Sequence, residues 1–214
     1  ENRRPFSLLR SNSIGALRKL GRDATTFGLA GCLFLLQVAQ MMVQGTWALY
    51  HQARFGWSLR SVGLSLMVAG LAIALVQGGL VRPVTQRVGE RAAVIVGLLF
   101  NLASDLAFAF ADRSWLVYAI LFPLAFGGLV GPAVQAILTR ASTATEQGEL
   151  QGSINSLSGV AAICGPLFGT TLLARFPVGP GHPGAVFLAA AMVTLVGLGL
   201  AIPSRAPRPL TTRE

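Results

Sequence analysis

Charged residues are scarce in this sequence, and their scarcity excludes an ordinary water-soluble domain. Asp, Glu, Lys and Arg make up 12% of the 214 residues, about half of the roughly 25% that is usual in soluble domains. Hydrophobic residues make up 53%. This composition indicates an integral membrane protein, and at about 20 residues per span the chain has room for about six spans.

Cysteine is also rare, and several kinds of site are missing. Cys32 and Cys164 both fall in apolar segments, where a free cysteine behaves as a small hydrophobe, so we predict neither a disulfide nor a metal site. The sequence lacks a nucleophile–base set and a phosphate-binding loop of the required pattern. We therefore expect no enzyme and no catalytic residues. The opening 24 residues are polar and basic and do not resemble a signal peptide.

One acidic residue stands inside an apolar stretch. Residues 92–111 are long enough to cross about 30 Å of hydrocarbon, yet they include Asp105 together with Asn101 and Ser104. A carboxylate in mid-span costs roughly 2.5–3.5 kcal/mol and usually faces a bundle interior or a water-filled cavity. Asp105 is therefore the first candidate for a functional residue. The alternative is that it only hydrogen-bonds a neighbouring helix.

The polar segments divide the apolar ones into six predicted transmembrane helices. The predicted spans are 25–50, 62–81, 92–111, 116–138, 153–174 and 185–202, with a basic linker at 1–24 and a tail at 203–214. Residues 51–61 are predicted to be a short loop in which His51 is solvated, and residues 82–91 a tight basic loop. The linker fits either an interfacial helix or a solvated tail.

Basic residues alternate between the two sides of this topology. The net charge is +9, and 13 of the 17 Lys and Arg residues fall in the linker, the second and fourth loops and the tail. The positive-inside rule then places both termini in the cytoplasm. Because the charge follows topology rather than one soluble face, we expect lipid as the partner and no nucleic acid.

Side-chain amides are the second polar feature of the apolar segments. Gln37, Gln40 and Gln44 are spaced i, i+3 and i+7, which places them on one face of a helix. Together with Asn101, Gln77 and Gln135 they either line a cavity for a polar ligand or bond neighbouring helices. Pro132 and the pair Gly165-Pro166 are predicted to bend their helices.

Six short motifs resemble those of one known family. They are Arg54-Phe-Gly-Trp57, Gly63-Leu-Ser-Leu66, Gly89-Glu-Arg91, Gly131-Pro-Ala-Val-Gln135, Gln147-Gly-Glu-Leu-Gln-Gly-Ser153 and Gly165-Pro-Leu167. Their order and spacing resemble the C-terminal half of a major facilitator superfamily transporter, and specifically the bacterial tetracycline/proton antiporters. The resemblance implies an all-α fold of six transmembrane helices that forms one half of the transporter as a 3+3 inverted repeat.

The sequence departs from the family pattern at two places. The resemblance implies an acidic residue at the position of Asn101 and a histidine at that of Ile73, and neither is present. Asp105, one turn further on, is the nearest replacement and the candidate for proton coupling or for contact with a cationic part of the substrate. In the loop 82–91 the glycine and the acid of the family motif are replaced, whereas Arg87, Gly89 and Arg91 remain as candidates for a cytoplasmic gating loop.

The resemblance implies export of a drug such as tetracycline in exchange for protons, across the bacterial cytoplasmic membrane. An N-terminal six-helix half of the same transporter, or a second copy of this chain, would be the partner. Protons would be the coupling ion, no cofactor is expected, and the drug could travel as a metal chelate. Two alternatives remain open: a truncated six-span protein without transport activity, and a homodimerising half-transporter for another solute.

Overall fold

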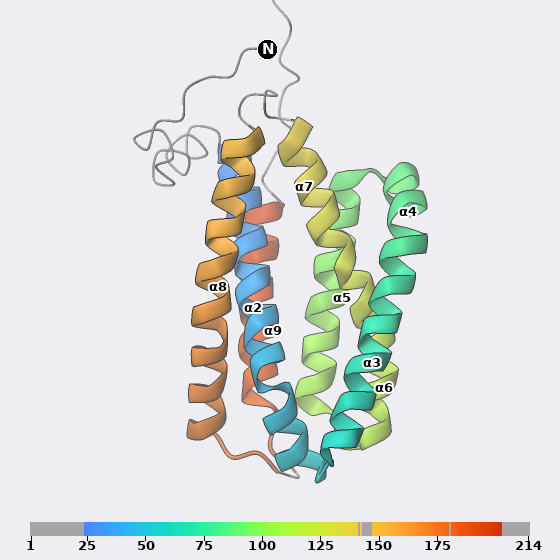
Figure 1. Ribbon diagram of the computed structural model, residues 1–214, viewed down its shortest axis with the longest axis vertical. Helices are drawn as coiled ribbons and strands as arrows, with labels where there is room; N and C mark the ends of the chain where they lie inside the picture. Colours follow the sequence, from blue (N-terminus) through green and yellow to red (C-terminus); the bar gives the residue numbers. More distant parts are fainter. Residues whose placement is uncertain (1–23, 141, 143–146, 180, 203–214) are drawn as a thin grey trace, which may run out of the picture.

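The computed structural model describes residues 24–140, 142, 147–179 and 181–202, and every regular element in them is helical (Figure 1). The α-helices are α2 (Ala24–Phe55), α3 (Leu59–Leu75), α4 (Val81–Val88), α5 (Glu90–Phe110), α6 (Ser114–Phe126), α7 (Val130–Arg140), α8 (Gln147–Arg175) and α9 (Ala185–Ala201). The all-α prediction is confirmed. The predicted linker, apart from residue 24, and the predicted tail lie outside the described residues.

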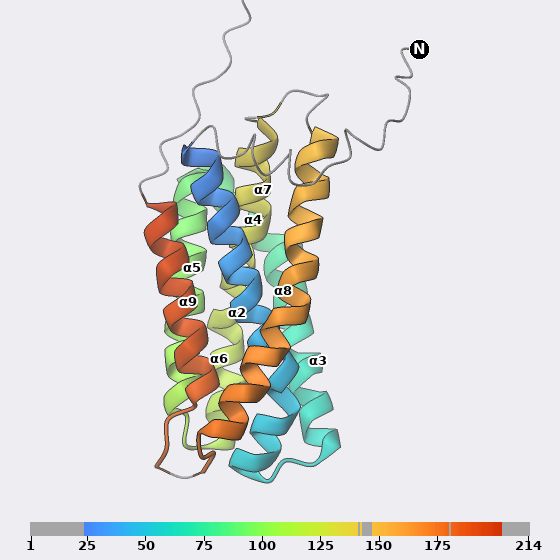
Figure 2. The same ribbon diagram turned by 90° about the vertical axis from the view of Figure 1, so that its left-hand side faces the viewer.

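Length and composition allow five of the helical stretches to cross a membrane. They are Thr26–Phe55, Leu59–Val88, Glu90–Phe110, Ser114–Arg140 and Leu150–Arg175. The sixth, Ala185–Ala201, is equally apolar but has only 17 residues. All of them run side by side along the long axis of the molecule, as two perpendicular views show (Figures 1 and 2).

The helices pack around α2 and α5. Helix α2 contacts α8 and α9, while α5 contacts α9, α6 and α7, and α3 lies against α6. The seam between α2 and α8 is close because glycines line it: a Cβ added to Gly165 would lie 2.6 Å from Cβ of Met41, and one added to Gly45 would lie 2.9 Å from Cβ of Pro166. Small residues give membrane helices this close approach.

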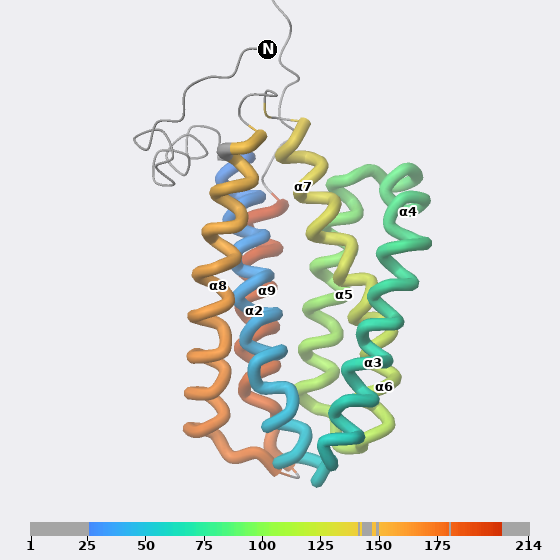
Figure 3. The backbone as a smooth tube through the Cα atoms, viewed as in Figure 1, coloured from blue at the N-terminus to red at the C-terminus, as the bar shows by residue number. Residues whose placement is uncertain are grey.

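Two of the long helical stretches change their winding in mid-course. A π-helical segment, η1 (Val76–Leu80), joins α3 to α4, and a 3₁₀ segment, η2 (Gly127–Leu129), joins α6 to α7. The tube in Figure 3 shows that each pair continues in one direction through its joint. Pro132 has no N–H and so cannot donate a helical hydrogen bond to the carbonyl oxygen of Gly128. A change of winding at η2, which contains Gly128, is therefore expected. The two segments lie in contact with each other.

Two loops are shorter than the sequence indicated. Residues 82–88 are helical, and only Gly89, with φ of +82°, separates α4 from α5. Glycine reaches this left-handed conformation without a Cβ clash, so one residue can reverse the chain. Similarly, α2 continues to Phe55 and ends before Gly56, whose φ is +65°.

The prediction for His51 was wrong. It lies inside α2 and is fully buried, because the ring packs among aromatic side chains instead of facing water. Trp47, His51 and Phe55 recur every four residues, so they share one face of α2 and extend that helix by more than a turn past the predicted end.

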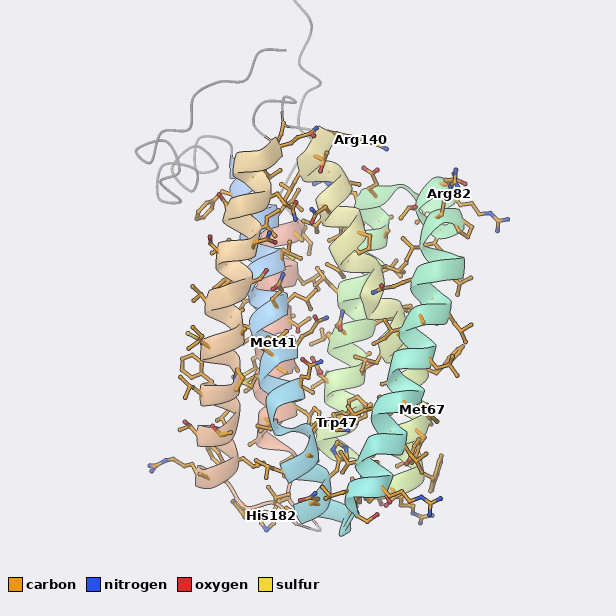
Figure 4. All side chains as sticks on the ribbon, in the orientation of Figure 1. Met41, Trp47, Met67, Arg82, Arg140 and His182 are labelled. Atoms are coloured by element: carbon orange, nitrogen blue, oxygen red, sulfur yellow. The ribbon has the colours of Figure 1, made fainter. Side chains whose placement is uncertain are left out.

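Hydrogen bonds tie the helices together at both ends of the bundle. Figure 4 shows Arg82 and Arg140 at one end and His182 at the other. Arg140 pairs with Glu90 at 2.9 Å between Nη2 and Oε1. At the opposite end the Arg54 guanidinium donates to the carbonyl oxygens of His182 and Ala111, at 3.0 and 3.2 Å. These contacts join segments that are distant in the sequence.

Candidate functional site

A cavity of about 260 Å³ lies between the helices at mid-length. Five helices and both irregular segments contribute to its wall. The polar or aromatic lining residues are Gln40, Gln44 and Trp47 from α2, Gln77 from η1, Asn101, Asp105 and Phe108 from α5, and Thr194 from α9. Apolar side chains, including Leu36, Leu66, Ile73, Leu121 and Leu124, complete it. An apolar wall with a few polar groups is the usual make-up of a small-molecule site.

Asp105 brings the only titratable side chain among the described residues that line the cavity. It is 7% exposed, and Thr194 of α9 stands next to it. A carboxyl group in this position borders both a packed helix seam and a space that a ligand or water can enter. It can therefore take up and release a proton as its surroundings change.

Asn101 lies one turn from Asp105 on the same wall and is 3% exposed. Its Nδ2 donates to the carbonyl oxygen of Gly97 at 3.1 Å. The amide group also fills the space beside Gly127. A Cβ added to that glycine would overlap all three heavy atoms of the amide group. The 3₁₀ segment η2 thus makes room for a polar side chain in a tightly packed place.

Gln77 reaches the cavity from the π-helical segment η1. Its Nε2 would lie 3.1 Å from a Cβ added to Gly128, so the side chain extends over η2. π-Bulges in helices occur frequently at functional sites, where they turn a side chain out of the regular helical register. The two irregular segments therefore bring the amides of Asn101 and Gln77 to adjacent parts of one wall.

The structure separates the six candidate amides into two groups. Gln40 and Gln44 are exposed on α2 and line the cavity with Gln77 and Asn101. Gln37 is not among the lining residues, and Gln135 donates instead to Oε1 of Gln151 on α8. The bond of Gln135 is of the helix-to-helix kind that the alternative for these amides describes, and the role of Gln37 stays a prediction.

The remaining candidates lie away from the cavity. Arg87 is at the end of α4, and Arg91, at the start of α5, donates to the carbonyl oxygen of Ile202 at 3.3 Å. Pro132 is in α7 just after the irregular segment η2. Gly165 and Pro166 form the close seam with α2. Their roles in gating and bending stay predictions.

Sequence reasoning missed an aromatic cluster next to the cavity. His51 stacks on Trp57 with 4.8 Å between ring centroids and lies 4.0 Å from the Trp47 ring. Its Nδ1 bonds the Trp47 carbonyl oxygen at 2.8 Å, and Tyr50 and Phe187 pack around it. Trp47 belongs to both regions, since it lines the cavity and donates from Nε1 to Oγ of Ser65 at 2.9 Å. The four-residue spacing of aromatic residues was the signal that could have revealed it.

The arrangement offers hydrogen bonding and proton exchange. Within the described residues no group of three or more His, Cys, Asp or Glu side chains could hold a metal ion. The cavity provides amides that both donate and accept, aromatic faces, and one carboxyl group. These groups can form hydrogen bonds and aromatic contacts with a bound small molecule.

Comparison with known proteins identifies the family. The model of the Major Facilitator Superfamily matches residues 29–214. The chain is 35% identical over 172 residues to the class C tetracycline resistance protein of Escherichia coli, covering 80% of this chain and 43% of that protein. It is also 35% identical over 195 residues to the class G tetracycline resistance protein of Vibrio anguillarum, covering 91% and 47%.

A solved structure shows the same fold. The human organic anion transporter MFSD10 (TETRAN) superposes with a TM-score of 0.69 at 21% identity, covering 94% of this chain and 43% of that one. The chain thus spans about half the length of the relatives that it matches. The resemblance noted in the sequence is confirmed, and the chain belongs to the Major Facilitator Superfamily of membrane transporters.

Proposed function

We propose that the chain forms the C-terminal half of a secondary transporter that exports a drug such as tetracycline in exchange for protons. The observation that supports this most is Asp105, a buried acid that borders a cavity lined by amides and aromatic rings. The two tetracycline resistance proteins, at 35% identity, support tetracycline as the first drug to test.

The exposed amides support the proposal that a partner domain forms a second wall of this cavity. Gln40, Gln44 and Gln77 are exposed on the surface of the chain, and an unpaired amide facing hydrocarbon costs several kcal/mol. Water and a partner domain are better neighbours for such a surface than lipid. An N-terminal six-helix half would supply this wall, and a second copy of the chain is the alternative occupant.

The proposed mechanism uses Asp105 as the group that carries the proton. The carboxyl group is protonated when the cavity opens to the outside and loses its proton when the cavity opens to the cytoplasm, while the amides hold the drug by hydrogen bonds. The proposed setting is the bacterial cytoplasmic membrane with both chain termini in the cytoplasm, which follows the distribution of basic residues.

Drug susceptibility tests this function. Cells that express the complete reading frame encoding this chain are challenged with tetracyclines and with unrelated drugs, alongside cells that express Asp105→Asn. We expect raised resistance to at least one drug with the unaltered protein and none with the variant at equal membrane abundance. Resistance that is unchanged by Asp105→Asn would refute the role of Asp105. Susceptibility to every drug tested, at normal abundance, would refute drug export.

A further inference from the structure

The hydroxyl group of Thr194 lies in the cavity beside the proposed proton carrier. Thr194 of α9 is 1% exposed, lines the cavity and stands next to Asp105. Its Oγ1 has no well-formed hydrogen bond among the described residues. Buried polar groups in proteins nearly always have a partner, and the Asp105 carboxyl is the polar group beside this one.

A hydroxyl suits a neighbour that gains and loses a proton. An ionised carboxylate can only accept hydrogen bonds, whereas a protonated carboxyl group also donates one. The Thr194 hydroxyl can donate to the first and accept from the second after a rotation about its own C–O bond. It serves both protonation states while keeping its own proton and without moving its backbone.

We propose that Thr194 is a positioning residue for the proton site, which orients the Asp105 carboxyl in both its ionised and its protonated state. This inference rests on the proposed function, because it assigns a partner to the proposed proton carrier. The proton itself passes from water to Asp105 and back to water, and Thr194 exchanges none.

The place of the pair in the fold supports this role. Helices α5 and α9 pack directly against each other, and they are the third helices of the two three-helix repeats of the family fold. The contact therefore crosses the boundary between the repeats.

Among the described residues that line the cavity, Thr194 is best placed to influence the protonation of Asp105. Helix α2 faces the cavity with Gln40 and Gln44, η1 with Gln77, and α6 with Leu121 and Leu124. No other charged or titratable side chain is present among the described lining residues. The buried His51 of α2 lies in the aromatic cluster and outside that lining.

Infrared spectroscopy tests the proposal without knowledge of the substrate. The purified protein from the complete reading frame is titrated in liposomes, and the carbonyl band of protonated Asp105 is identified by its loss in Asp105→Asn. Thr194→Val removes the hydroxyl at equal size, and Thr194→Ser restores it. Thr46→Val is the matched control, because Thr46 is also 1% exposed but bonds the Met42 carbonyl oxygen of its own helix at 2.8 Å.

We expect Thr194→Val to shift the pH midpoint of the Asp105 band by about one unit, because the hydrogen bond to the ionised carboxylate is about twice as strong as the one to the neutral acid and only this difference moves the midpoint. Thr194→Ser and Thr46→Val should leave the midpoint where it is. Thr194→Ala replaces the valine variant if that one does not fold. An unchanged midpoint in the folded Val or Ala variant would overturn the proposal.

The transport assay distinguishes this inference from the function on which it depends. If Asp105→Asn abolishes proton-driven transport but Thr194→Val leaves the band unmoved, the positioning role fails and the function stands. If Thr194→Val moves the band but Asp105→Asn transports normally, the hydrogen bond stands and the coupling role fails. A protein in which no band is lost with Asp105→Asn refutes both.

Discussion

Asp105 and His51 are both buried ionisable residues within apolar helices, yet their surroundings differ. Asp105 borders a cavity, with amides on the same wall and a hydroxyl beside it. His51 is enclosed by aromatic rings, one nitrogen bonds its own helix, and it does not line the cavity that Asp105 borders. Burial by itself therefore does not distinguish the two residues. Access to a space that water or a ligand can enter makes the difference.

The largest expected effect comes from moving the acid. Asp105→Asn should reduce proton-driven uptake into everted vesicles to the level of vesicles without the protein. Asn101→Asp added to that variant should restore a measurable part, because position 101 lines the same cavity. His51→Asp added instead should restore nothing, because position 51 has no access to it.

Recovery by His51→Asp would contradict the difference between the two positions, since it would show that any buried acid can carry the proton. Failure of Asn101→Asp in a well-folded protein would mean that lining the cavity is not enough and that the proton site is limited to the position of Asp105. Membrane abundance of each double variant is measured beside uptake as the control.

The next effect concerns the stability of the aromatic cluster. His51→Ala removes a ring that packs against Trp47 and Trp57, and by analogy with other large-to-small core changes it should cost about 2–4 kcal/mol of stability. His51→Phe keeps most of the ring contacts and should be nearly neutral. Thermal unfolding in detergent measures the stability of both variants. The His51→Phe variant should also show the same pH dependence of transport as the unaltered protein. A changed pH dependence would assign His51 a part in coupling.

A smaller effect separates two glutamines of the same helix. Gln44 lines the cavity and Gln37 does not. Loss of one hydrogen bond to the substrate is worth about 1 kcal/mol, so Gln44→Ala should raise the substrate KM about fivefold, while Gln37→Ala leaves it unchanged. Equal effects of the two variants would mean that the amides act through helix packing.

The smallest effect is expected at the end of the bundle. Arg140 pairs with Glu90, but its side chain is 77% exposed, and exposed pairs contribute less than about 1 kcal/mol. Glu90→Gln should therefore leave the unfolding temperature and the transport rate nearly unchanged. A large loss of transport with normal stability would instead place a gating contact at this end.

Most of the fold could be predicted from the apolar segments of the sequence, because each helix needs about 20 apolar residues to cross the membrane. Asp105 stood out for the opposite reason, as a costly residue in such a run. His51 was misplaced because a solvated loop suits a polar ring, although its four-residue spacing from Trp47 and Phe55 fits one face of a helix. The packing of Trp57 and Phe187 against the ring shows that it is buried.

Other parts of the site could not be predicted from local sequence. The π-helical segment at 76–80 turns Gln77 toward the cavity, and its sequence Val-Gln-Gly-Gly-Leu fits an ordinary helix end equally well. Thr194 is unremarkable in an apolar helix, since threonine commonly bonds its own backbone there. Its meaning depends on α5 and α9 meeting, which is a property of the whole bundle.

Proton movement after substrate addition tests whether Asp105 carries the proton that is exchanged for the drug. Everted vesicles with the complete protein and a pH indicator inside are given the drug to which the protein confers resistance, and substrate counterflow is measured in parallel. We expect drug-dependent proton release from vesicles with the unaltered protein, and no release with Asp105→Asn although counterflow persists. Equal proton release by the two proteins would contradict this role of Asp105.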